Sequence, residues 1–95
     1  MYIVNLIYVK PLTEIEEHIR LHREFLDVYY AKDIFLASGP KNPRDGGIIL
    51  ASGKVSRTEL DNILAEDPFQ QHGLARYDIT EFEPNKHHGA LSGIL

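Results

Sequence analysis

Two segments of this 95-residue chain are apolar at almost every position, and they restrict the possible folds more than any other feature. Residues 2–9 read YIVNLIYV, and residues 48–51 read IILA. Uninterrupted apolar runs are typical of strands covered on both faces, because a strand with one wet face alternates apolar and polar residues. Both segments are therefore predicted to be central strands of a sheet.

A helix and a further strand are predicted between these two segments. Thr13 is a candidate N-cap, and the glutamates that follow it favour a helix over residues 13–31, because carboxylates stabilise the first turn. Residues 34–37 are predicted to form a strand. It should end at the turn Ser38, Gly39, Pro40 and lead into a loop over 41–47, which is rich in glycine and proline.

The last part of the chain predicts one more helix and one more strand. Ser56 and Glu59 fit a capping box at the start of a short amphipathic helix, which should stop before Asp67 and Pro68. Residues 77–82 alternate between apolar and polar side chains, which indicates a strand with one wetter face at the edge of the sheet.

The order of these elements is βαββαβ, which indicates an α+β domain over residues 1–84 followed by a tail over 85–95. With right-handed crossovers this order gives the ferredoxin-like arrangement, a four-stranded antiparallel sheet with both helices on one face. The first and third strands are then central. Because both are apolar on both sides, the face without helices needs a cover, and we expect a homodimer stacked through that face.

Charge and composition exclude several classes of partner. Lysine and arginine residues are scattered singly and the formal net charge is −4, whereas nucleic-acid binding needs a basic stripe or helix. No apolar run approaches the roughly 18 residues of a membrane span. Cysteine is absent and residues 1–8 lack the basic start of a secretory signal, so a cytoplasmic location is expected.

His22 lies where the apolar stripe of the first helix calls for a hydrophobic residue. A buried imidazole without a hydrogen-bond partner costs on the order of 1–3 kcal/mol, so a partner should exist, and Asp67 is the leading candidate. Taken alone, each residue also has a structural explanation, since buried polar groups usually find local partners and Asp67 could simply end a helix. The apolar stripe consists of Leu12, Ile15, Ile19, Leu26 and Tyr30.

Four features together resemble the YCII-related (YciI-like) family over residues 1–84. They are His22, the tripeptide Ser38, Gly39, Pro40, the segment Gly47, Ile48, Ile49, and the segment Glu66, Asp67, Pro68, Phe69. The resemblance implies the fold of the dimeric α+β barrel proteins. It also implies that His22 and Asp67 are the presumed active-site pair. Two departures are Asp33, where many members have a helix-ending glycine, and the tail with His87 and His88, which has no recognised counterpart.

A histidine paired with a carboxylate is suited to moving protons. Imidazole exchanges a proton near neutral pH, and a carboxylate on its other nitrogen fixes the tautomer. The chain has no cysteine and no recognisable nucleophile elbow, so proton transfer is favoured over attack on a carbonyl. The candidate substrate-binding residues are Ser38, Gly39 and Pro40, with Tyr8 and Phe69 as aromatic walls and Arg44 or Arg23 as an anion site.

Two functions remain open at this point. The first is an enzyme that catalyses an isomerisation, a lyase reaction or, as the resemblance implies, a dehydrochlorinase-type elimination on a small cyclic or hydroxylated aromatic substrate. The second is a non-catalytic dimeric module that binds a metabolite or another protein. No cofactor is expected, because the glycines match neither a phosphate-binding loop nor a dinucleotide fingerprint. No metal is expected either, because His18, His22 and Glu14 lack further ligands of a specific site.

Overall fold

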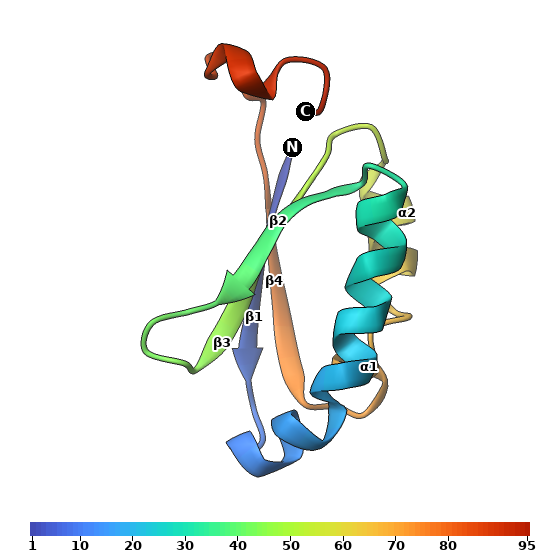
Figure 1. The fold of residues 1–95 in the computed structure, drawn as a ribbon, viewed down its shortest axis with the longest axis vertical. Helices are drawn as coiled ribbons and strands as arrows, with labels where there is room; N and C mark the ends of the chain where they lie inside the picture. The colour runs from blue at the N-terminus through green and yellow to red at the C-terminus, as the bar shows by residue number, and fades with distance from the viewer.

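The computed structural model describes residues 1–95, which form an antiparallel four-stranded sheet with its helices packed on one face (Figure 1). The α+β, ferredoxin-like prediction is confirmed. The elements in chain order are β1 (Tyr2–Tyr8), α1 (Leu12–Ala31), β2 (Phe35–Pro40), β3 (Gly46–Ala51), α2 (Arg57–Leu64), α3 (Pro68–Gln71), β4 (Ala75–Glu81) and a final turn of 3-10 helix, η1 (Gly89–Leu91).

The strand order is β2-β3-β1-β4, so the two apolar segments occupy the centre of the sheet as predicted, and β4 lies at an edge. Val4 is the register partner of Ile49 in β3 and of Ile79 in β4. These side chains point toward the helices. The alternation along β1 is clear, because Tyr2, Val4 and Leu6 are buried while the intervening residues are only half-buried.

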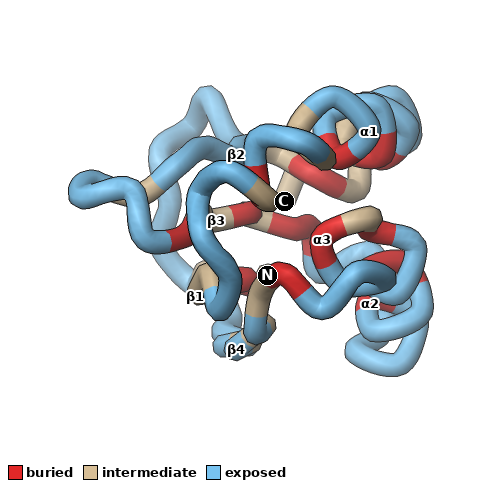
Figure 2. Tube along the Cα trace, turned by 90° about the horizontal axis from the view of Figure 1, so that it is seen from below, coloured by how far each residue is buried: buried red, intermediate tan, exposed pale blue.

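The hydrophobic core fills the space between the sheet and the helices, where the buried positions gather (Figure 2). An aromatic cluster of Phe25, Tyr29 and Phe35 joins α1 to β2, with ring centroids 5.5–5.7 Å apart. Burial of large apolar side chains such as these contributes roughly 1.5–3 kcal/mol each. This packing fixes α1 across the sheet.

The segment Ser38, Gly39, Pro40 is part of a strand, so the prediction of a turn there is wrong. After an irregularity between Phe35 and Ala37, these three residues pair with Ile49, Ile48 and Gly47 of β3. Proline has no backbone N–H to donate, and it is tolerated in β2 because this edge strand has a neighbouring strand on one side only.

Two helix starts differ in how well the sequence predicted them. Helix α1 begins at Leu12 with Pro11 as its N-cap and no side-chain cap, so Thr13 lies inside the helix and its predicted capping role is wrong. Ser56 does cap α2, because its Oγ accepts the N–H of Glu59 at 3.1 Å.

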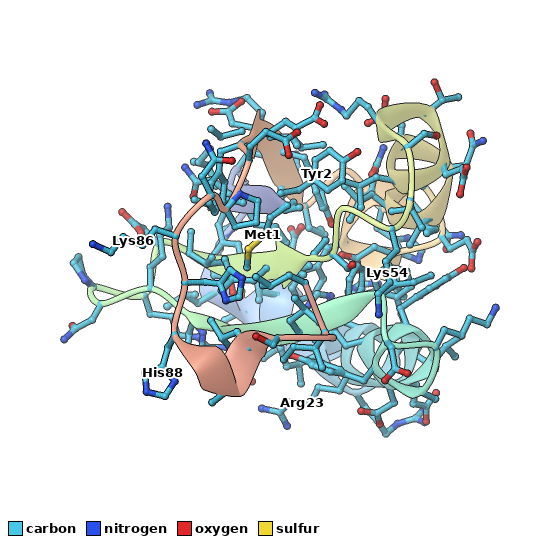
Figure 3. The ribbon with its side chains drawn as sticks, turned by 90° about the horizontal axis from the view of Figure 1, so that it is seen from above. Met1, Tyr2, Arg23, Lys54, Lys86 and His88 are labelled. Carbon is cyan, nitrogen blue, oxygen red and sulfur yellow. The ribbon has the colours of Figure 1, made fainter.

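The face of the sheet that carries no helix exposes part of an apolar surface. Ile3, Ile7 and Leu50 lie on this face and are half-buried. The C-terminal segment lies beyond one end of the sheet, near Met1, and Lys54 Nζ donates to the carbonyl of Gly93 at 3.2 Å (Figure 3). None of the helices is both long and apolar enough to span a bilayer.

Candidate active site

His22 and Asp67 meet at the contact between α1 and α3, although 45 residues separate them in sequence. His22 lies on the sheet-facing side of α1 and is 9% exposed, while Asp67 caps the N-terminus of α3 and is fully buried. The Nδ1 of His22 lies 2.8 Å from Oδ1 of Asp67. The fold therefore brings together the two residues that the sequence analysis paired.

Three donors surround the Asp67 carboxylate. Oδ1 accepts from His22 and from the backbone N–H of Phe69, at 3.0 Å, while Oδ2 accepts from the hydroxyl of Tyr77 at 2.5 Å. A buried charge is tolerated only when hydrogen bonds of this kind compensate its lost hydration. Burial, with the adjacent Asp67 carboxylate, raises the pKa of Tyr77 far above its ordinary value, so the phenol is a neutral donor.

The imidazole of His22 has one nitrogen engaged and one free. Its ring stacks on Phe69, with centroids 4.0 Å apart and planes within 3° of parallel. Nε2 makes no hydrogen bond within the chain. Only one fully buried side-chain polar atom lacks a hydrogen-bond partner, and it is Oδ1 of Asn5. Nε2 of His22, which also has no partner, is therefore not fully buried. With Nδ1 donating to Asp67, Nε2 carries the lone pair of a general base.

A cavity of about 660 Å³ lies between α1 and the strands β2 and β3 and reaches His22. This volume is within the range of roughly 300–1,000 Å³ that is usual for small-molecule sites. Asp67 does not line it and instead supports His22 from behind. Eight of the predicted site residues line it, namely Tyr8, His22, Arg23, Ser38, Gly39, Pro40, Arg44 and Phe69.

About half of the residues that line the cavity are hydrophobic, and its polar groups are partly paired. Arg44, from the loop after β2, forms an ion pair with Glu16 of α1, and this contact raises the pKa of the guanidinium. At the other end of α1, Tyr30 and Ser38 share a hydrogen bond of 2.6 Å between their hydroxyl groups. Arg23 also lines the cavity, and Figure 3 shows its side chain at the molecular surface.

The remaining histidines do not assemble around His22. His18 packs against His72 of the α3 end, with ring centroids 4.4 Å apart, and no group of three or more His, Cys, Asp or Glu side chains is arranged to hold a metal ion. His87 and His88 are exposed in the C-terminal segment, where His88 caps η1.

Tyr77 and the short helix α3 were not predicted from the sequence. Tyr77 occupies an inward-facing position of β4, opposite Leu6, where a tyrosine is expected to seek a partner for its hydroxyl. That alternation was the available signal. Helix α3 has only four residues, which is too short to leave a periodic pattern.

Comparisons with known proteins agree on the fold. No curated protein sequence matches the chain. Among solved structures, the chain is similar to 5-chloro-2-hydroxyhydroquinone dehydrochlorinase from Burkholderia phenoliruptrix, in complex with 2,5-dihydroxybenzoquinone, with a TM-score of 0.71 and 17% sequence identity over 87% of this chain and 94% of that one. The model of the YCII-related domain matches residues 1–83. The resemblance seen in the sequence is thus confirmed, and the chain belongs to the YCII-related domain family.

Proposed function

We propose that this protein is an enzyme in which His22 and Asp67 transfer a proton to or from a small cyclic or hydroxylated aromatic substrate. The observation that carries the proposal is the asymmetry of the imidazole, whose Nδ1 is held by a buried carboxylate while Nε2 stands free beside a cavity. A general base needs both features, because its tautomer must be fixed and its lone pair must reach the substrate.

The proposed step is an elimination or an isomerisation that starts with proton abstraction. Nε2 of His22 takes a proton from a hydroxyl or C–H group of the substrate, and the electron pair left behind forms a new C=O or C=C π bond. In an elimination, a leaving group such as chloride departs with its bonding electrons. In an isomerisation, the imidazolium returns the proton to another atom. The transfer itself requires only side chains of this chain, and Asp67 stabilises the imidazolium that forms.

The composition of the cavity supports a ring-shaped, partly hydroxylated substrate. Tyr8 and Phe69 meet edge to face with centroids 6.0 Å apart, next to the aliphatic walls, and this surface fits a flat apolar ring. Ser38 and Arg44 provide polar groups for ring oxygens, and Gly39 and Pro40 complete that wall. The structural neighbour acts on a chlorinated hydroxyhydroquinone, which has this chemistry.

The functional unit is proposed to be a homodimer. Ile3, Ile7 and Leu50 form the centre of a sheet face that no helix covers, and a second copy related by a twofold axis would bury it. Stacking through this face leaves the cavity accessible, because the cavity lies on the helix side of the sheet.

Three variants and a ligand panel test the proposal. The panel contains chlorinated and unchlorinated hydroquinones, small lactones and 2,5-dihydroxybenzoquinone, with chloride release and absorbance changes measured for turnover. Ring signals of His22 are followed by NMR for binding. We expect turnover of at least one compound class, and a loss of roughly 10²–10⁴-fold in His22→Gln, which keeps a donor for Asp67.

The matched control is His18→Gln, one helical turn away and outside the cavity, which should retain turnover. Absence of any His22 response across the panel, together with a large stability loss in His22→Ala, would instead assign the pair a structural role in a non-catalytic module.

A further inference from the structure

The phenol of Tyr77 is the sole hydrogen-bond partner of one oxygen of Asp67. Oδ1 is shared by His22 and the N–H of Phe69, whereas Oδ2 has only the Tyr77 hydroxyl. Asp67 forms no ion pair with a lysine or an arginine. One carboxylate therefore joins three elements, α1 through His22, α3 through its first turn and β4 through Tyr77.

We infer that Tyr77 is a positioning residue that keeps Asp67 ionised and correctly oriented, so that Nε2 of His22 remains free to act on the substrate. This inference rests on the proposed function, in which His22 is the proton-transfer group. Tyr77 does not line the cavity and acts only through Asp67.

The hydrogen bond has a fixed direction. A carboxylate can only accept, so the tyrosine hydroxyl donates, and a donor aimed at the charged form of an acid favours that form. Burial alone would favour the neutral acid. A neutral Asp67 would itself carry a proton that His22 Nδ1 could accept, which would move the histidine proton to Nε2 and remove the base from the cavity.

Several other ionisable groups lie around the site without contacting the Asp67 carboxylate. Tyr8 of β1 lies near Tyr77, and Arg44 forms an ion pair with Glu16. The charged groups facing His22 across the cavity or along its rim are Glu16, Arg23, Asp27 and Arg44. None of them contacts the Asp67 carboxylate, so loss of the Tyr77 donor has no substitute among them.

The test compares Tyr77→Phe with Tyr29→Phe. Tyr29 is a matched control because its hydroxyl also donates to a carboxylate, Glu66, at 2.7 Å, and makes no hydrogen bond to His22 or Asp67. NMR of histidine-labelled protein records the pH at which the His22 ring signals change. Without its third donor, Asp67 becomes more basic and holds the imidazolium more strongly, so the pair takes up its proton at a pH higher by at least about half a unit. Tyr29→Phe should leave the midpoint in place.

The acid side of the activity profile should move upward by the same amount in Tyr77→Phe, because turnover needs an unprotonated Nε2. An unchanged midpoint in folded Tyr77→Phe overturns the inference even if the wild-type protein is active. A shifted midpoint without turnover in any protein preserves the coupling and refutes the proposed function.

Should Tyr77→Phe fail to fold, the unaltered protein provides a second measurement. The hydrogen bond that it donates to the Asp67 carboxylate should protect the Tyr77 hydroxyl proton from exchange and give a downfield resonance with a cross-peak to the Nδ1 proton of His22. A freely exchanging hydroxyl would overturn the assignment.

Discussion

Removal of the Asp67 carboxylate should destabilise the protein far more than its conversion to an amide. Asp67→Ala deletes the cap of α3, worth about 1 kcal/mol, and leaves the buried donors of His22 and Tyr77 without an acceptor, at about 1–3 kcal/mol each. These terms add to about 3–7 kcal/mol, and removal of one partner of a buried pair typically costs about 3–5 kcal/mol, so a loss of at least about 3 kcal/mol is expected. That is a large share of the roughly 5–15 kcal/mol by which domains are stable.

Asp67→Asn has nearly the same shape and keeps most of these contacts. Its amide oxygen can accept from Phe69 and His22, while its NH₂ group can donate to the Tyr77 oxygen, whose hydroxyl then turns away. The expected loss is about 1–2 kcal/mol, because three charge-assisted hydrogen bonds become neutral ones.

Urea unfolding at neutral pH, followed by far-UV circular dichroism, measures both free energies of unfolding. A double-mutant cycle with His22→Ala isolates the coupling between the two side chains. Equal losses in Asp67→Ala and Asp67→Asn, or a loss below about 1 kcal/mol in the alanine variant, would refute the idea that this carboxylate satisfies three donors.

Two further predictions concern regions outside the site. Burial and the hydrogen bond to Glu66 raise the pKa of Tyr29 to about 12 from an ordinary value of 10.0, so its contribution to stability is complete below pH 10 and is lost as the pH rises toward 12. The free energy of unfolding, measured across this pH window, should fall less in Tyr29→Phe than in the wild type. An equal fall in both proteins would contradict the raised pKa of Tyr29. Sedimentation velocity should show a dimer for the wild type and a folded monomer for Ile3→Lys, whereas a wild-type chain that stays monomeric at every concentration would exclude the proposed dimer.

The fold could be predicted largely because two strands carry unusually continuous apolar runs. Such runs require cover on both sides, and this fixed Tyr2–Tyr8 and Gly46–Ala51 as the central strands. The end of β2 could not be recognised. Serine, glycine and proline carry the local signal of a turn, and only pairing with β3 in three dimensions overrides it.

Asp33 shows that a departure from the family pattern can preserve the backbone. It follows α1 with a φ of 57°, in the left-handed region where glycine is usual. Aspartate is, with asparagine, among the few other residues that enter this region at modest cost. The substitution therefore changes the residue while keeping the path of the chain into β2.

The site was predictable in part because a histidine interrupts an apolar stripe, and a polar group in such a place demands a partner. The same reasoning cannot separate a structural pair from a catalytic one, since both bury His22 against Asp67. The feature that bears on the choice between these two roles is the second imidazole nitrogen, Nε2. A histidine that only ties a helix to a loop is most stable when both nitrogens are bonded, whereas Nε2 of His22 has no partner in the chain and stands beside a cavity of about 660 Å³. Three donors surround Asp67, whereas no donor of the chain is directed at the lone pair of Nε2, and this imbalance supports proton transfer rather than mechanical attachment.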